Sequence, residues 1–101
     1  MTVFRKTNGR CFYCNKPADV VDHFIPKKLW REWVLENVLG KVDQIGNLFP
    51  SCCSCNSSKG GRPVEDFAEK LGISGAQIHN RSTRANQRIG LEMDVPRNTF
   101  I

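Results

Sequence analysis

The chain has 101 residues, of which 40% are hydrophobic and 25% are charged, with 15 lysines and arginines against 10 acidic residues. This length excludes a multi-domain arrangement, and the composition is that of a folded globular protein. No apolar run approaches the roughly 18 residues that cross a bilayer, and residues 1–10 lack the apolar stretch of a secretion signal. We therefore expect a cytoplasmic protein with reduced cysteines, and the net charge of +5 makes nucleic acid a candidate partner.

The first predicted elements are a short strand and a helix. Residues 20–22 carry two valines and a carboxylate shortly before a proline, which favours a strand that cannot continue far. Residues 29–39 carry Trp30, Val34 and Val38 at helical spacing, with glutamates away from that face. This pattern predicts one amphipathic helix.

The rest of the chain predicts a second strand over residues 47–50, followed by three helices. These helices cover residues 52–59, 63–71 and 75–89. Ser74 and Gln77 have the spacing of a capping box at the start of the last helix. Apart from the helix at residues 29–39, the predicted order along the chain is strand, strand and helix, followed by two further helices.

Four of the five cysteines form two C-x-x-C pairs, separated by 37 residues. They are Cys11, Cys14, Cys52 and Cys55. Two such pairs complete the tetrahedral four-thiolate shell of a structural zinc ion, with no position left for a substrate. The alternative is a pair of disulfides or unligated buried thiols. Cys53 could replace Cys52 only by making the second pair C-x-C, so we expect it to be a core thiol.

Polar residues between the cysteine pairs are of the types that metal-assisted phosphodiester chemistry uses. They are Asp22, His23, Asn47, Asn56 and Lys59. Each also has an ordinary structural interpretation: a surface polar pair, a turn or helix cap, or a solvated lysine. Neighbours on a regular strand point to opposite faces, so Asp22 and His23 serve one site only at a strand end or bulge.

Taken in order, these residues resemble the HNH endonuclease family. The pattern is C-x-x-C, Asp-His-x-x-Pro, Asn-Leu and C-x-x-C-Asn-x-x-Lys-Gly, from Cys11 to about Gly60. The resemblance implies an α+β fold, a small ββα-metal core over residues 11–61 that a zinc ion holds together, with a helical extension over residues 62–101. We expect residues 1–101 to form a single nuclease domain.

The resemblance also implies roles for individual residues. Asp22 and Asn56 match ligands of a catalytic Mg²⁺ or Mn²⁺ ion, for which oxygen donors are suited. His23 matches the general base, and Asn47 matches the residue that braces the loop between the strands. The expected reaction is nicking or double-strand cleavage of DNA by hydrolysis.

Basic residues supply candidate contacts to a phosphate backbone. These are Lys27, Lys28 and Lys59 near the polar residues and Arg81, Arg84 and Arg88 on one stripe of the last helix. A solvated helix face is the ordinary alternative for the stripe. Trp30 and Trp33 are expected in the core, and His79 at the surface.

Two other classes of function compete with the nuclease. One is a catalytically inactive zinc-ribbon module that binds nucleic acid, and the other is a protein-interaction zinc module, which leaves the basic stripe unexplained. We expect the nuclease to be a monomer or a homodimer in a bacterial or phage-infected cell. Its biological role is expected in phage packaging, restriction or a mobile element.

Overall fold

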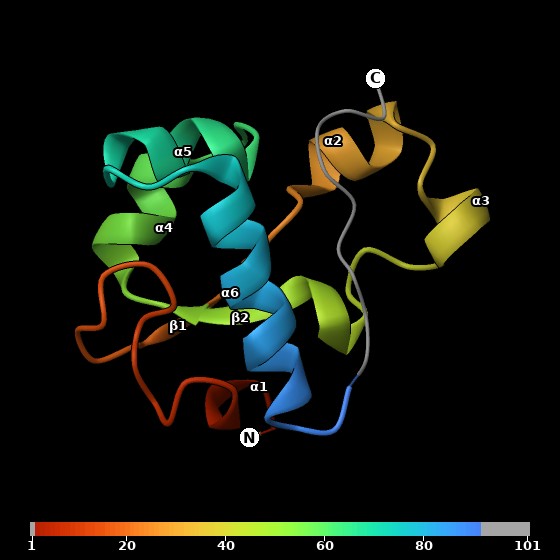
Figure 1. Ribbon diagram of the computed structural model, residues 1–101. Helices are drawn as coiled ribbons and strands as arrows, with labels where there is room; N and C mark the ends of the chain where they lie inside the picture. Colours follow the sequence, from red (N-terminus) through yellow and green to blue (C-terminus); the bar gives the residue numbers. More distant parts are fainter. Residues whose placement is uncertain (1, 92–101) are drawn as a thin grey trace.

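The computed structural model describes residues 2–91 (Figure 1). Its elements are α1 (Thr2–Arg5), β1 (Val20–His23), α2 (Lys27–Glu32), α3 (Glu36–Leu39), η1 (Ile45–Asn47), β2 (Leu48–Ser51), α4 (Cys53–Lys59), α5 (Val64–Lys70) and α6 (Gly75–Gln87). None of these helices has the length and apolar character needed to cross a membrane. The part of the predicted extension from 92 to 101 lies outside the described residues.

The two strands form an antiparallel sheet in which Val20 pairs with Ser51 and His23 pairs with Leu48. Only Cys52 separates β2 from α4, so the predicted order of strand, strand and helix is confirmed, as is the small α+β class. The second strand starts one residue later than predicted because the chain ends a turn of 3-10 helix at Asn47.

Buried aromatic rings pack the N-terminal loop against the two strands. Phe12, Phe24 and Phe49 are all at most 4% exposed, and the centroid of the Phe49 ring lies 4.6 Å from that of Phe12 and 5.3 Å from that of Phe24. Full burial of one such side chain stabilises a fold by about 1.5–3 kcal/mol. This cluster therefore holds the ends of β1 and β2 in place.

Helix α6 runs across the sheet in Figure 1 and begins with the predicted capping box. The Ser74 hydroxyl accepts a bond from the Gln77 amide (3.0 Å), and the Gln77 side chain accepts one from the Ser74 amide (2.7 Å). The apolar face of α6 is buried, because Ile78 and Ala85 are 0% and 6% exposed.

The single helix predicted over residues 29–39 is wrong, since α2 and α3 are separate. Val34 has a φ of 54°, and the Leu35 amide bonds back to the Trp30 carbonyl (3.1 Å), as in the motif that commonly ends helices. Leu35 is thereby turned into the core at 4% exposed, whereas Val34 and Val38 are 56% and 79% exposed. The helical spacing of the two valines misled because the buried side chain is Leu35.

Candidate active site and metal centre

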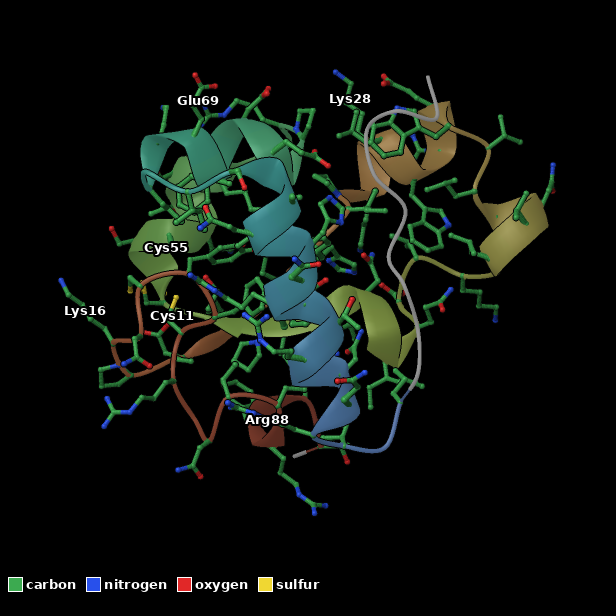
Figure 2. All side chains as sticks on the ribbon, in the orientation of Figure 1. Cys11, Lys16, Lys28, Cys55, Glu69 and Arg88 are labelled. Atoms are coloured by element: carbon green, nitrogen blue, oxygen red, sulfur yellow. The ribbon has the colours of Figure 1, made fainter. Side chains whose placement is uncertain are left out.

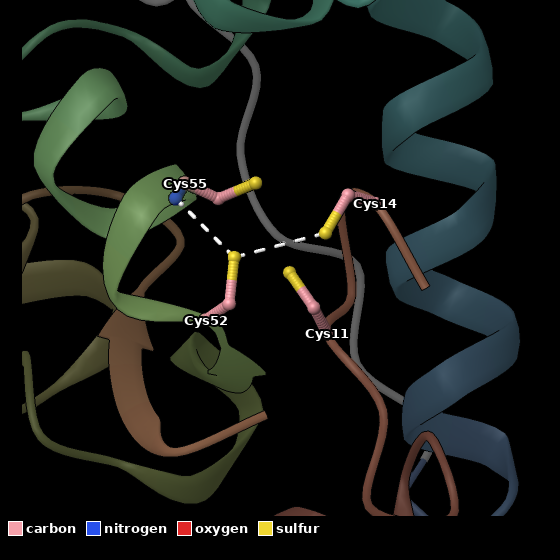
Figure 3. Close-up of side chains that lie close together, drawn as sticks. All are labelled: Cys11, Cys14, Cys52 and Cys55. Carbon is pink, nitrogen blue, oxygen red and sulfur yellow. Dashed lines mark hydrogen bonds between the residues drawn. The ribbon is translucent and has the colours of Figure 1, made fainter. Parts of the chain in front are cut away.

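Four sulfur atoms meet between the N-terminal loop and the start of α4 (Figure 3). They all lie within 4.8 Å of one another, and the Sγ atoms of Cys14 and Cys52 are 3.7 Å apart. A tetrahedron with zinc–sulfur bonds of about 2.3 Å has sulfur–sulfur edges of about 3.8 Å, so the cluster has a suitable size. The cysteines Cys11, Cys14, Cys52 and Cys55 are free thiols positioned to bind a metal such as zinc.

Backbone hydrogen bonds shape both cysteine pairs. In the first pair, the Cys11 amide donates to the Lys16 carbonyl (2.6 Å), and Asn15 takes a φ of 67° that asparagine tolerates. In the second pair, Cys52 is the N-cap of α4, and its sulfur accepts a bond from the Cys55 amide (3.4 Å). The fold therefore directs the thiols toward one point through its own backbone.

The thiols differ in how readily they ionise. Burial raises the pKa of Cys14 and of Cys55 above the ordinary value. Burial acts in the same direction on Cys11, but hydrogen bonds from backbone amides outweigh it and lower the pKa of Cys11 to about 7. Thiolates are the ligands that zinc requires, so metal binding releases protons and strengthens as the pH rises.

Cys53 is exposed, so the expectation of a core thiol is wrong. It is the first residue of α4, and the helix directs it away from the cluster that contains Cys52 and Cys55. A hydrogen bond with Asp19 raises the pKa of the Cys53 thiol.

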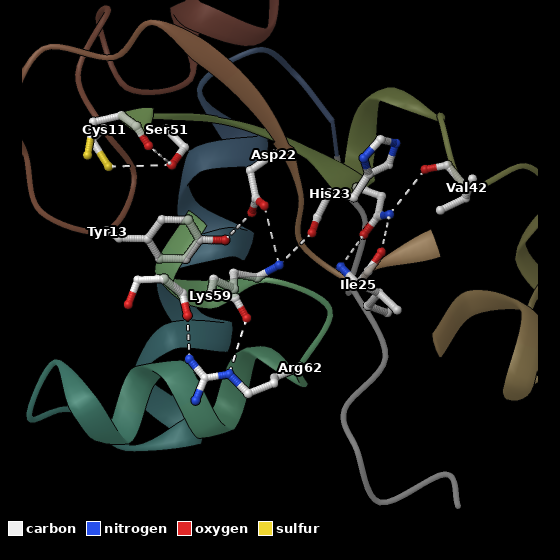
Figure 4. A network of polar contacts seen from close by, with 12 residues as sticks. Cys11, Tyr13, Asp22, His23, Ile25, Val42, Ser51, Lys59 and Arg62 are labelled. Carbon is white, nitrogen blue, oxygen red and sulfur yellow. Dashed lines mark hydrogen bonds and ion pairs between the residues drawn. The ribbon is translucent and has the colours of Figure 1, made fainter. Parts of the chain in front are cut away.

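Asp22 lies in the interior, 4% exposed, between the first cysteine pair and α4 (Figure 4). One carboxylate oxygen accepts a hydrogen bond from the Tyr13 hydroxyl, and the other lies 3.3 Å from the Lys59 ammonium. Burial raises the pKa of Asp22, while the Lys59 charge and the Tyr13 hydroxyl oppose this rise. The same burial, together with the Asp22 charge, raises the pKa of Tyr13.

Lys59 is 1% exposed, which corrects both expectations for it. Its ammonium donates to the His23 carbonyl (2.8 Å) and pairs with Asp22, so it is neither solvated nor free to contact a DNA phosphate. Burial lowers the pKa of Lys59, and the Asp22 charge opposes this shift. The lysine fastens the last turn of α4 to the end of β1.

His23 is the last residue of β1, and its side chain is 24% exposed. Its Nε2 atom lies 2.7 Å from Oδ1 of Asp43, in the segment between α3 and η1. Asp22 and His23 thus contact different partners, one inside the protein and one at the surface. The strand ends at His23 with no bulge in the register.

Asn47 closes the base of the long connection between the strands. It is 0% exposed, and its Oδ1 accepts from the Ile25 amide (2.9 Å). Its Nδ2 donates to the carbonyls of Ile25 and Val42, at 3.1 Å each. One side chain therefore joins the two ends of the segment that carries α2 and α3.

Asn56 lies one helical turn before Lys59 on α4 and is half-buried. Within residues 2–91 no hydrogen bond to its side chain is found, and the Asp22 carboxylate accepts only two bonds of the roughly four that it can take. One carboxylate and one amide oxygen, completed by water and phosphate, are a donor set that Mg²⁺ accepts. The donor chemistry fits a divalent ion, with Lys59 as a competing cation.

The arginine stripe of α6 lies beside a groove of about 410 Å³ that is also lined by the first cysteine pair. Arg81 donates to the Phe12 carbonyl (3.1 Å), and Arg88 donates to the Lys6 carbonyl (3.2 Å). Arg84 is exposed, and no hydrogen bond to its guanidinium is found in the described part of the chain. Two of the three arginines thus also join α6 to the N-terminal segment.

The predicted basic residues do not form one surface. Lys27 and Lys28 are exposed on α2, and Figure 2 shows Lys28 and Arg88 at opposite ends of the molecule. Lys27 lines a groove of about 270 Å³ together with Asp43, the partner of His23.

His79 is buried at 4% exposed, so the expectation of a surface histidine is wrong. Its Nε2 atom lies 2.6 Å from Oε2 of Glu65 on α5, and its ring packs edge-on against Phe24. The contact joins α5 and α6, and the two residues, 14 positions apart, have no spacing that indicates it.

Sequence reasoning missed the roles of Tyr13 and Asp43. The Tyr13 contact had no local signal, because its partner Asp22 lies nine positions away in a different segment. Asp43 had none either, since it belongs to an irregular segment 20 residues after His23.

A family model described as HNH endonuclease matches residues 11–62. No curated protein and no solved structure matches the chain. The matched segment starts at the first clustered cysteine, contains both strands and α4, and covers half of the chain. With the ββα order and the cysteine cluster in place, the chain belongs to the HNH endonuclease family, as the resemblance of its motifs implies.

Proposed function

We propose that this chain is a metal-dependent endonuclease that hydrolyses phosphodiester bonds in DNA. The observation that supports it best is the docking of α4 on the end of β1. Lys59 contacts both Asp22 and the His23 carbonyl, so the residues that the family pattern marks belong to one rigid ββα unit. A fixed unit of this kind is what a hydrolytic site needs.

In this proposal His23 acts as the general base. A neutral imidazole takes a proton from a water molecule aligned with the scissile phosphorus. The side chain is part-exposed at a strand end, where a substrate can reach it. The products carry a 5′ phosphate and a 3′ hydroxyl.

Asp22 and Asn56 are the proposed ligands of Mg²⁺ or Mn²⁺. When bound, the ion supplies charge stabilisation for the phosphate and the departing oxygen. Asn47 holds the connection that follows His23, and the four cysteines hold zinc in a structural role. Four thiolates leave no open position on the zinc ion, so the zinc site contributes to stability and the Asp22 and Asn56 site to catalysis.

The groove along α6 is the proposed contact for the DNA backbone, with Lys27 and Lys28 as a second contact. Arg84 is exposed beside this groove. Replacing it with alanine should weaken DNA binding at low salt and reduce the salt dependence by about one counterion. Equal salt slopes for Arg84→Ala and wild type would assign this arginine to an ordinary solvated face.

The buried ion pair favours one alternative function. Lys59 lies 3.3 Å from Asp22 and competes with a divalent ion for the same carboxylate. The alternative is a zinc-stabilised module that binds nucleic acid without cutting it.

A plasmid assay separates the two functions. Zinc-loaded protein is incubated with supercoiled DNA, first without further metal and then with Mg²⁺ or Mn²⁺. We expect metal-dependent nicked or linear DNA, abolished in His23→Ala and strongly reduced in Asn56→Ala. Asn80→Ala is the control, because Asn80 is an exposed asparagine on α6. A mobility shift without cleavage by any of these proteins would support the binding module.

A further inference from the structure

The contact between His23 and Asp43 determines which ring nitrogen of His23 carries a proton. Nε2 of His23 and Oδ1 of Asp43 are 2.7 Å apart. The hydrogen bond from His23 lowers the pKa of Asp43, and the nearby charges of Lys27 and Lys41 lower it further. An ionised carboxylate only accepts hydrogen bonds, so Nε2 must carry the proton. The neutral ring then has its lone pair on Nδ1.

The backbone on both sides of Asp43 is held in place. The carbonyl of Val42 accepts a bond from the buried Asn47 side chain (3.1 Å). On the other side, the Gln44 side chain donates to the carbonyls of Leu39 (2.6 Å) and Lys41 (3.0 Å). An exposed ion pair on a free loop contributes little, but here the residues before and after the carboxylate are anchored. The contact is thus built into the fold.

We propose that Asp43 is a positioning residue for hydrolysis, which orients the His23 ring and fixes Nδ1 as the atom that accepts the proton. This inference rests on the proposed function. As the water oxygen forms its bond to phosphorus, its proton passes to Nδ1. The bond from phosphorus to the 3′ oxygen breaks, and that oxygen keeps the electron pair and takes a proton from solvent. The resulting imidazolium is stabilised by the Asp43 charge through Nε2.

The test compares Asp43→Asn and Asp43→Ala with a charge-matched control. Glu36→Gln removes an exposed carboxylate from the same groove, so it changes the field on the substrate by a similar amount. We expect both Asp43 variants to lower kcat by about tenfold or more, a part of the roughly 10²- to 10⁴-fold that a general base contributes, with little change in KM. Glu36→Gln should keep the wild-type kcat.

Nitrogen NMR of the ring reads the tautomer without any need for activity. The chain has only two histidines, so a His23→Ala spectrum assigns the signals. We expect the Nε2-protonated form of His23 in the wild type and a mixture of tautomers in Asp43→Ala.

The outcomes separate this inference from the proposed function. If the wild type cuts DNA and both Asp43 variants have the wild-type kcat, the positioning role is overturned. The proposed nuclease function is unaffected by that result. A wild-type protein that does not cut contradicts the proposed function, and the tautomer then decides the inference alone. A His23 tautomer that is the same in wild type and Asp43→Ala overturns it.

Discussion

Replacing Asn47 with alanine should destabilise the fold strongly, because one buried side chain makes three hydrogen bonds to backbone. The bonds join Oδ1 to the Ile25 amide and Nδ2 to the carbonyls of Ile25 and Val42. At about 0.5–1.5 kcal/mol each, the three bonds together contribute about 2–4 kcal/mol to the free energy of unfolding. The Ile25 amide is also left buried without this partner. The loss is measurable by urea unfolding, followed through the fluorescence of Trp30 and Trp33, at a fixed zinc concentration.

Asn86 is the matched control for this prediction. It is also 0% exposed, but within the described residues its side chain donates one bond, to the Gly46 carbonyl (3.2 Å), and its Oδ1 has no partner. Asn86→Ala deletes the same atoms from a similar environment, so the cavity term is comparable. We expect it to cost about 1 kcal/mol or less. Equal losses for the two variants, or a loss below about 1 kcal/mol for Asn47→Ala, would refute the hydrogen-bond account.

Three further predictions concern the metal and the buried lysines. We expect zinc at the four cysteines, and chelating it should lower the free energy of unfolding by about 4 kcal/mol. This value is the closure entropy of a loop of this size, since Cys14 and Cys52 are 38 positions apart. An unchanged thermal melt with EDTA contradicts this. Lys59→Met should cost about 3–5 kcal/mol because it leaves the Asp22 charge buried and unpaired, and adding Asp22→Asn should recover much of the loss. If the single variant melts like wild type, the ion pair does not hold α4. Burial lowers the pKa of Lys6 from 10.5 to about 8. Between pH 8 and pH 10.5 the unfolded chain therefore binds more protons than the folded chain. The contribution of Lys6 to the free energy of unfolding thus increases as the pH rises through this range. The stability difference between wild type and Lys6→Met, measured by urea unfolding from pH 7 to 10, should therefore grow with pH; a constant difference contradicts the shift.

The sequence predicted what depends on local pattern. The cysteine spacing indicated the metal cluster, and the capping-box spacing indicated the start of α6. The short runs at residues 20–22 and 47–50 indicated the two strands. Each of these features depends on a few neighbouring residues, whose local preferences are independent of the rest of the fold. The motif order from Cys11 onward was enough to indicate the family.

The sequence could not predict features that depend on tertiary contact. The break after α2 required a valine with positive φ, which local preference disfavours, and the burial of Leu35 outweighs that cost. The burial of Lys59 and His79 depends on acidic partners at distant positions, Asp22 and Glu65. No periodicity encodes such pairs, so charged side chains were expected at the surface.

Tyr13 connects the cysteine cluster to the proposed catalytic carboxylate. It lies between Cys11 and Cys14, and its hydroxyl bonds to Asp22. Oxidation of one of the four clustered thiols would shift the turn that carries this tyrosine and so disturb the proposed catalytic carboxylate. For the proposed nuclease, the supply of reduced thiols and zinc in a cell under oxidative stress would then set the amount of active enzyme, with every proposed hydrolytic residue chemically intact.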